Sequence, residues 1–127
     1  MKKKVESSKA PAAAGPYSQA IEAAGMVFAS GQLPIDFRSG EIPAGIEEQT
    51  RASLENLSAV LEAAGCTLAD VVKTTVFLDN MDNFGVVNSI YAEYFQSPFP
   101  GRSCFQVAKL PKAAKVEIEA IAVKNER

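Results

Sequence analysis

The spacing of apolar residues predicts two helices in this 127-residue chain. Over residues 46–64, apolar side chains recur at helical spacing and form one stripe. Gly65 follows as a residue suited to the left-handed conformation that ends many helices. A second helix is predicted over residues 83–95, with Asp82 as its N-cap. Its apolar face comprises Phe84, Val87, Tyr91 and Phe95.

Extended segments rich in β-branched and aromatic residues alternate with these helices. The predicted strands comprise residues 17–23, 26–30, 70–78, 102–108 and 115–123. The order β-β-α-β-α-β-β predicts an α+β fold with a mixed sheet and both helices on one face. No linker or repeat divides the chain, so residues 1–127 are expected to form a single domain.

The last predicted strand has two different faces, because successive strand residues point to opposite sides. One face is small and apolar and suits burial under helices: Val116, Ile118, Ala120 and Ala122. The other face carries carboxylates beside β-branched residues: Glu117, Glu119, Ile121 and Val123. A fully buried surface does not tolerate unpaired carboxylates, and a solvent-facing one does not need Ile and Val. We therefore predict a homo-oligomer interface that encloses a polar site. Residues 70–78 repeat the pattern, with Val71, Lys73, Thr75 and Phe77 expected on one face.

Composition and charge exclude several classes of binding and catalytic site. The chain has 13 Lys and Arg against 15 Asp and Glu, and its net charge of −2 argues against broad binding to nucleic acid. The absence of histidine excludes a Ser-His-Asp triad, a Cys-His pair and a His-ligated zinc site. The N-terminal lysines are interpreted as a solvated tail, and no apolar run approaches the ~20 residues of a membrane helix. The expected compartment is the cytoplasm.

Arg102, Cys104 and Gln106 share one face of their predicted strand. If that strand lies beside the last one, Arg102 and Cys104 come close to Glu117 or Glu119. One interpretation is an ion pair that ties strands or subunits together. The other is a guanidinium that binds a substrate carboxylate, with a nearby glutamate that orients or deprotonates water. A Cys104 nucleophile is disfavoured because no histidine can serve as its base.

Two other readings of these segments remain weak. Glu117 and Glu119 resemble a glycosidase carboxylate pair, but they project in parallel from one strand instead of flanking a bond. Gly15-Pro16-Tyr17 places an aromatic hydroxyl after a rigid turn, and Ser30-Gly31-Gln32 contains a glycine that permits close approach of a ligand. Either segment is also consistent with ordinary turn chemistry.

Six segments together carry a family resemblance. They read APAAAGPYSQA (10–20), FASGQLPID (28–36), QTRASLENLSAVLEAAG (49–65), DVVKTTVFLDNMDNFGVVNSIYAEYF (70–95), PGRSC (100–104) and VAKLPKAAKVEIEAIAV (107–123). In order and spacing they resemble the Rid family of reactive-intermediate deaminases, also called YjgF, and most of all its RidA type. The resemblance covers essentially the whole chain.

The resemblance implies a chorismate-mutase-like fold that assembles as a homotrimer with ligand clefts between subunits. It also implies hydrolysis of 2-enamine and 2-imine acids, such as 2-aminoacrylate and 2-iminobutanoate, to 2-keto acids and ammonia. PLP-dependent dehydratases acting on serine or threonine release such substrates. No metal or organic cofactor is expected.

The resemblance further implies a site made of Tyr17, Ser30, Gly31, Asn88, Arg102, Cys104 and Glu117. Arg102 would bind the substrate carboxylate, and Glu117 would hold or activate the attacking water. The backbone at Cys104 and Gly31 would hydrogen-bond the ligand, and Tyr17 would close the cleft. Ser30 and Asn88 would line or support the site.

One position departs from the family pattern, because Gly101 stands where the family usually has alanine before the arginine. The added backbone freedom could loosen Arg102, at a cost of roughly 0.5–1 kcal/mol. Two alternative functions remain open: a non-catalytic sensor of small carboxylates or a chaperone-like protein, and, less favoured, the endoribonuclease and translation inhibitor of an older family label.

Overall fold

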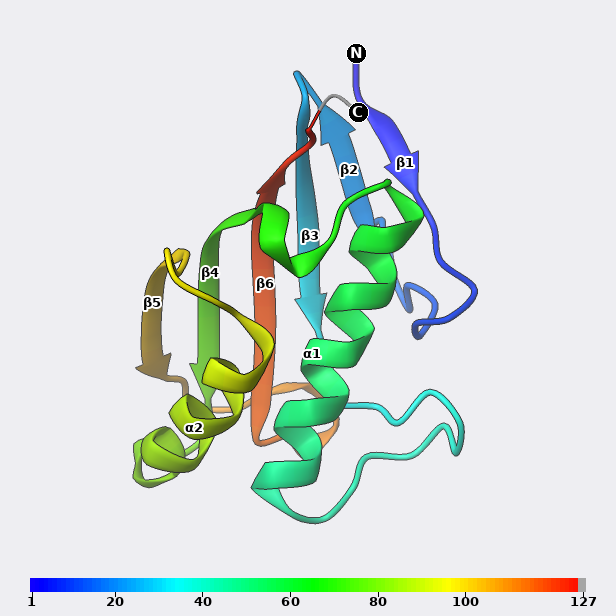
Figure 1. The fold of residues 1–127 in the computed structure, drawn as a ribbon. Helices are drawn as coiled ribbons and strands as arrows, with labels where there is room; N and C mark the ends of the chain where they lie inside the picture. Colours follow the sequence, from blue (N-terminus) through cyan, green and yellow to red (C-terminus); the bar gives the residue numbers. More distant parts are fainter. Residues whose placement is uncertain (126–127) are drawn as a thin grey trace.

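The computed structural model describes residues 1–125, which form a six-stranded sheet with two helices on one of its faces (Figure 1). The strands are β1 (Lys3–Val5), β2 (Ala20–Ala23), β3 (Met26–Gln32), β4 (Val71–Leu78), β5 (Gly101–Gln106) and β6 (Val116–Val123). The helices are α1 (Ile46–Ala63) and α2 (Phe84–Tyr94). The strand order is β1-β2-β3-β6-β4-β5, with β4 and β5 parallel and all other neighbours antiparallel. The predicted α+β class and mixed sheet are confirmed.

The core lies between the helices and one face of the sheet. All four residues of the predicted buried face of β6 are at most 3% exposed: Val116, Ile118, Ala120 and Ala122. The apolar stripe of α1 covers them with Leu54, Leu57, Val60 and Leu61, all fully buried. The helix ends as predicted, with Gly65 in the left-handed region at a φ of 81°. Alternation along β6 and periodicity along α1 therefore describe the same interface.

A buried polar stripe on α1 holds the chain where it leaves β3. The Ser53 hydroxyl donates a hydrogen bond of 2.8 Å to the carbonyl of Gln32. The Asn56 amide donates to the carbonyls of Leu33 and Ile35 at 3.0 and 2.8 Å. These bonds give partners to backbone carbonyls at the end of β3 and in the segment that follows it. They also fix the segment that follows Ser30 and Gly31.

Several predicted boundaries are wrong for identifiable reasons. Residues 3–5 are not a solvated tail, because they pair with β2 as an edge strand. The hairpin begins at Ala20 instead of residue 17, and the N-cap of α2 is Asn83 instead of Asp82. A register shift between Val71 and Lys73 breaks the alternation of β4. As a result Val71 is buried on the helix-covered side and does not share the face of Lys73.

The opposite face of the sheet is covered by no helix among the described residues, and we call it the open face (Figure 1). It carries large apolar side chains, and Phe28, Phe105 and Val123 are each at least 40% exposed. The rings of Phe77 and Phe105 pack edge to face at 5.3 Å. An exposed apolar surface of this kind is typical of a protein interface.

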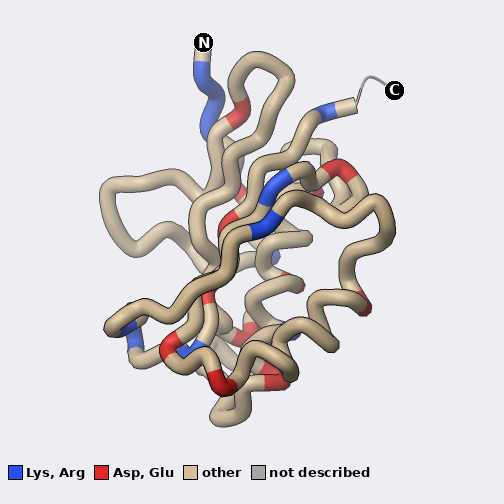
Figure 2. Tube along the Cα trace, turned by 90° about the vertical axis from the view of Figure 1, so that its left-hand side faces the viewer, with Lys and Arg blue, Asp and Glu red and all other residues tan. Residues whose placement is uncertain are grey.

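Both basic and acidic positions occur along the trace when the molecule is viewed from the β5 side (Figure 2). Within residues 1–125 no helix is long and apolar enough to cross a membrane. The same part of the chain contains no group of three or more Cys, Asp or Glu side chains placed to hold a metal ion.

Candidate active site

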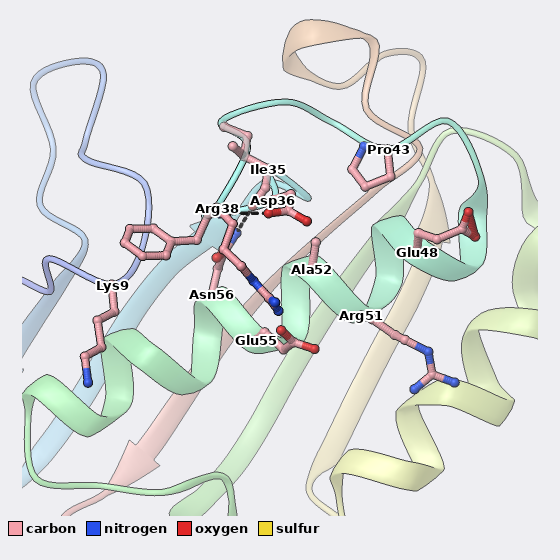
Figure 3. Close-up of a pocket in the computed structure, with 11 residues that line it drawn as sticks. Lys9, Ile35, Asp36, Arg38, Pro43, Glu48, Arg51, Ala52, Glu55 and Asn56 are labelled. Atoms are coloured by element: carbon pink, nitrogen blue, oxygen red, sulfur yellow. Dashed lines mark hydrogen bonds between the residues drawn. The ribbon is translucent and has the colours of Figure 1, made fainter.

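A pocket of about 370 Å³ lies along the outer side of α1, between the helix and the loop that follows β3 (Figure 3). Its polar groups already have structural roles. Asn56 donates to the loop, as described above, and Asp36 accepts from the backbone amides of Arg38 and Ser39. The pocket therefore gives little support for a reactive site.

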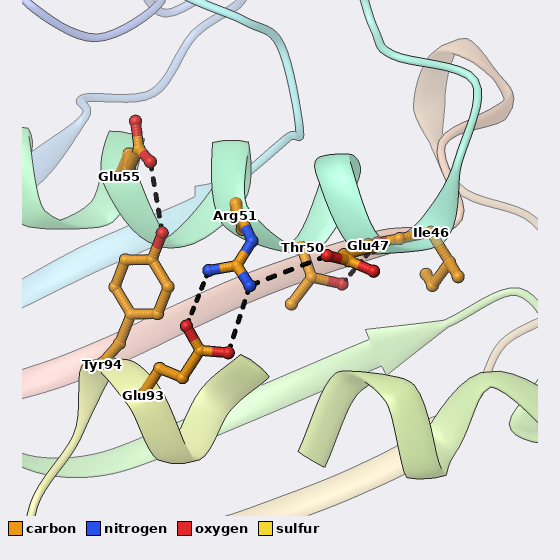
Figure 4. Close-up of polar contacts among 7 residues, drawn as sticks. All are labelled: Ile46, Glu47, Thr50, Arg51, Glu55, Glu93 and Tyr94. Carbon is orange, nitrogen blue, oxygen red and sulfur yellow. Dashed lines mark hydrogen bonds and ion pairs between the residues drawn. The ribbon is translucent and has the colours of Figure 1, made fainter. Parts of the chain in front are cut away.

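Arg51, at the edge of the same pocket, connects the two helices (Figure 4). Its guanidinium donates two parallel hydrogen bonds to the Glu93 carboxylate, at 2.9 and 3.1 Å. The hydrogen bond from Arg51 lowers the pKa of Glu93 from its ordinary value. Tyr94 donates a further hydrogen bond to Glu55 at 3.2 Å. These exposed contacts connect α1 to α2 but contribute little to the position of α2, since exposed ion pairs are weak. The helix α2 carries one half of the candidate site.

The first half, which we call the arginine cluster, consists of Arg102, Asn88, Tyr91, Phe84 and Cys104. Arg102 Nη1 donates a hydrogen bond of 2.8 Å to Asn88 Oδ1. The guanidinium carbon lies 4.9 Å from the ring centre of Tyr91 and 5.5 Å from that of Phe84. No carboxylate among residues 1–125 pairs with Arg102. The arrangement leaves in-plane N–H donors available to an incoming anion.

Cys104 lies two residues along β5 from Arg102 and is partly buried. Burial raises the pKa of its thiol above the ordinary value, and the nearby Arg102 opposes this shift only in part. The thiol is therefore protonated near neutral pH, and a thiolate nucleophile at this position is disfavoured. The side chain is better suited to filling space beside Arg102.

The second half, which we call the Glu117 pocket, is a cavity of about 490 Å³. It is lined by Ala14, Tyr17, Ser30, Gly31, Leu33, Pro111, Lys112, Glu117 and Glu119. Four of the predicted site residues therefore meet here. Glu117 and Glu119 point into the pocket from β6, because residues two apart share a strand face.

A bulge in β3 brings Ser30 and Gly31 to this pocket. Ala29 pairs with Ala120 and Gln32 pairs with Ile118, so the two residues between them on β3 face the single residue Glu119. Bulges of this kind bend a strand and redirect its side chains. The Ser30 hydroxyl donates a 2.6 Å hydrogen bond to the carbonyl of Ser18, so it supports the loop before β2.

Gly31 permits close approach of the Glu117 carboxylate, because a β-carbon at position 31 would overlap it. We predict that Gly31→Ala displaces this flexible carboxylate and strongly reduces turnover, with a stability loss of at most about 1–3 kcal/mol from overpacking. Turnover and urea unfolding should be measured together. Gly85→Ala is the matched control, because no atom lies within 4 Å of the added carbon. Equal effects of the two substitutions on turnover would contradict the role of Gly31 in leaving room for the Glu117 carboxylate.

Tyr17 lies at the mouth of the Glu117 pocket and is 53% exposed. Its hydroxyl accepts a hydrogen bond of 3.3 Å from the amide of Ala14, and its own amide donates to the carbonyl of Gly15 at 2.8 Å. Gln19 then fixes the preceding loop, because its buried side chain accepts from the Ser7 amide at 2.6 Å and donates to the Pro11 carbonyl at 2.8 Å. The tyrosine is therefore presented by an ordered loop.

The Glu117 carboxyl is half-buried. Burial, and secondly the negative charge of Glu119, raise its pKa above the ordinary value of 4.5. A raised pKa brings a carboxylate nearer to the strength required of a general base near neutral pH. It also means that the folded protein binds this proton more tightly than the unfolded chain does, so ionised Glu117 destabilises the fold.

We predict that Glu117→Gln makes the protein more stable than wild type above the raised pKa. The gain should shrink as pH falls through that pKa and disappear below 4.5, where the carboxyl is protonated in both states. Urea unfolding at a fixed chain concentration, from about pH 8 to about pH 4, measures the difference. Glu41→Gln, which removes a carboxylate at an exposed position, is the control for the change in net charge. A constant difference across this range would refute the prediction.

The two halves do not meet within one chain. The order β3-β6-β4-β5 places β4 between β5 and β6, so the condition under which Arg102 and Cys104 would approach Glu117 or Glu119 within one chain is not met. Glu117 aligns with Phe77 in β4, and Phe77 aligns with Phe105, so this face is the open face. Arg102 instead aligns with the buried Thr74 and turns to α2. Arg102 and Glu117 therefore lie on opposite faces of the sheet.

Sequence reasoning missed parts of both halves. Phe84 and Tyr91 were assigned to the apolar face of α2, and nothing in their spacing indicates that they also contact Arg102. Pro111 and Lys112 lie between the predicted strands 102–108 and 115–123, and this segment contains a short 3₁₀ turn that lines the Glu117 pocket. Lys112 adopts a positive φ of 57° there, which its sequence context does not signal.

The family model described as Endoribonuclease L-PSP matches residues 7–124. The chain is 46% identical over 128 residues to the 2-iminobutanoate/2-iminopropanoate deaminase of Escherichia coli K12, covering 98% of this chain and all of the relative. It is 49% identical over 126 residues to the mouse protein of the same name, covering 98% and 93%. The crystal structure of E. coli TdcF with bound serine superimposes with a TM-score of 0.93 at 47% identity, covering 97% and 99% of the two chains.

The fold and the two half-sites define an α+β protein whose candidate ligand-binding groups lie on both faces of one sheet. The chain belongs to the Endoribonuclease L-PSP family, which is also known as the Rid or YjgF family. The resemblance drawn from the sequence is thereby confirmed. Its relatives include proteins named as deaminases of imino acids.

Proposed function

We propose that this protein hydrolyses 2-enamine and 2-imine acids, such as 2-aminoacrylate and 2-iminobutanoate, to 2-keto acids and ammonia. The observation that carries the proposal is near-full-length identity of 46% and 49% to two proteins named 2-iminobutanoate/2-iminopropanoate deaminase. The arginine cluster supports it, because a guanidinium with free donors suits the carboxylate of such substrates. A relative crystallised with bound serine also supports a site for a small α-amino or α-keto acid.

The proposed reaction needs an anchored substrate and one activated water. The substrate carboxylate binds Arg102, while Glu117 accepts a proton from water as its oxygen bonds to the imine carbon. The π electron pair of the C=N bond moves to nitrogen, which takes the proton from Glu117 to give a carbinolamine. The hydroxyl proton then passes to the nitrogen through Glu117, an oxygen lone pair forms the C=O bond of the keto acid, and the C–N bond breaks to release ammonia. An enamine substrate first takes a proton on carbon to become the imine. Positioning and proton transfer provide the catalysis.

The proposed site lies between subunits of a homotrimer. Arg102 and Glu117 face opposite sides of one sheet, so a small substrate that touches both requires groups from two copies. The open face offers the apolar contact surface for such assembly, with Phe28, Phe77 and Phe105 around the edge of the polar region. Tyr17, Ser30 and Gly31 accompany Glu117 on one copy, and Asn88 and Cys104 accompany Arg102 on the next.

The direct test measures keto-acid release while a dehydratase generates 2-aminoacrylate or 2-iminobutanoate in the assay. The protein should accelerate keto-acid formation above the uncatalysed hydrolysis, and chemical quenching should show a matching decrease in the imine. A folded oligomer that gives no acceleration would overturn the proposal. In that case binding of 2-oxobutanoate without turnover would identify a carboxylate sensor.

RNA cleavage is the weaker interpretation of the family description. The chain has no histidine for phosphodiester acid-base chemistry. Its net charge of −2 also disfavours RNA binding, which draws on clustered positive charge. Cytoplasmic function alongside PLP-dependent dehydratases, without a metal or organic cofactor, is part of the deaminase proposal.

A further inference from the structure

The orientation of Arg102 depends on groups behind the arginine cluster. We propose that Tyr91, held by Thr74, is the positioning residue that aims the Arg102 guanidinium at the substrate carboxylate. This inference rests on the proposed role of Arg102 as the carboxylate anchor. It adds a positioning role for Tyr91 and Thr74, to which the proposed reaction assigns no step. Neither residue needs to touch the substrate.

Two contacts fix the ring of Tyr91, one to its hydroxyl and one to its face. Its side chain is buried, with 5% exposure, and its hydroxyl shares a buried 2.7 Å hydrogen bond with Thr74 Oγ1. The ring of Phe95 packs against it with centroids 4.4 Å apart. A buried tyrosine hydroxyl requires a polar partner, and the fully buried Thr74 provides it from the sheet.

Thr74 connects this ring to the strand that carries the arginine. In the parallel pairing of β4 and β5, Thr74 stands directly beside Arg102. The Tyr91 hydroxyl therefore contacts the residue that pairs with Arg102 in the sheet. The Tyr91 ring contacts the end of the Arg102 side chain, where the guanidinium carbon lies 4.9 Å from the ring centre. This geometry links the sheet, α2 and the guanidinium in one fixed unit.

An aromatic support suits a carboxylate-binding arginine for an electrostatic reason. A carboxylate partner would orient Arg102 but would neutralise its charge and occupy the donors that the substrate needs. A ring attracts the cation through its face and leaves the in-plane N–H groups free. Gly101 increases the need for such support, because the residue before the arginine adds backbone freedom instead of limiting it.

The test compares affinity for 2-oxobutanoate, by calorimetry, with KM and kcat for the imine. Tyr91→Leu should weaken 2-oxobutanoate binding and raise KM by about fivefold to tenfold, the effect expected of one lost cation–π contact, while kcat changes little. Thr74→Val should raise KM as well, because it leaves the Tyr91 hydroxyl buried without a partner. Thr74→Ser retains the hydroxyl and should stay near wild type.

A double variant separates positioning from simple damage to the core. Thr74→Val combined with Tyr91→Phe removes both hydroxyls and leaves no buried group unpaired, and its KM should stay raised as in Thr74→Val, because the ring is no longer held by the sheet. Return of KM to the wild-type value would show that the unpaired hydroxyl alone raised KM in Thr74→Val, and would overturn the role of Thr74. Tyr94→Phe removes a hydroxyl from the same helix that bonds Glu55, and it should leave KM unchanged. Size-exclusion chromatography of each variant establishes that the same oligomer is compared.

The outcomes distinguish this inference from the proposed activity. Unchanged affinity and KM in folded Tyr91→Leu would overturn the positioning role even if the wild-type protein is an active deaminase. Weaker 2-oxobutanoate binding in Tyr91→Leu would support that role even if the wild-type protein hydrolyses no imine. Failure of wild type to bind any small carboxylate would overturn both.

Discussion

Replacing Arg102 with alanine is expected to reduce kcat/KM for 2-iminobutanoate by roughly 10²–10³-fold, because truncating one partner of a desolvated charge pair costs about 2–5 kcal/mol. The loss should appear in substrate binding as well as in turnover, since the guanidinium anchors the group that does not react. Keto-acid release and calorimetric binding of 2-oxobutanoate measure the two effects separately.

Arg38→Ala is the matched control for this loss. Arg38 is an exposed arginine at the α1 pocket, remote from both half-sites, so its removal changes the net charge equally without touching the proposed site. Arg102→Lys keeps the charge but not the planar pair of donors, and it should recover only part of the activity. Wild-type kcat/KM in the Arg102→Ala protein would remove the carboxylate anchor from the proposed mechanism.

Replacing Glu117 with glutamine is expected to reduce kcat by about 10²–10⁴-fold, the usual contribution of a general base. Binding of 2-oxobutanoate should change far less, because the glutamine fills the same space in the Glu117 pocket. Arg102→Ala should therefore lose both substrate binding and turnover, whereas Glu117→Gln should lose turnover alone.

The neighbouring glutamate supplies the control for Glu117. Glu119→Gln removes a carboxylate from the same pocket and strand face, and it should retain substantial turnover. Because the charge of Glu119 helps to raise the pKa of Glu117, this variant should also shift the acidic limb of the pH–rate profile to lower pH. Equal losses in the two variants would show that the pocket tolerates no carboxylate change, which contradicts a specific role for Glu117.

The sequence predicted those parts of the fold that depend on local periodicity. The α1 helix was predicted to within one residue because its apolar stripe and Gly65 give the same boundary. The two faces of β6 followed from alternation alone, so the placement of Glu117 and Glu119 together on one face needed no knowledge of the topology. The short edge strand at residues 3–5 was missed because two of its three residues are lysines and its pairing with β2 is a tertiary event.

The arrangement of the site was harder to predict, because strand order depends on contacts between distant segments and no local sequence pattern indicates it. The parallel pairing of β4 and β5 moves Arg102 away from β6 and onto the helix-covered side. The bulge at Ser30 and Gly31 depends on how β3 meets β6. Tyr91 has the spacing of an ordinary core residue, and only its position over the guanidinium indicates a second role.

The most direct test of the divided site is recovery of activity by mixing two inactive variants. Arg102→Ala and Glu117→Gln chains, carrying different affinity tags, should be co-expressed and the mixed oligomers purified through both tags. If Arg102 comes from one copy and Glu117 from the next, every mixed homotrimer contains one site with both wild-type groups, so about one site in three is restored. Mixed oligomers are expected to regain roughly this fraction of wild-type turnover, whereas each variant alone stays inactive. Mixed oligomers as inactive as either parent would contradict a site divided between subunits.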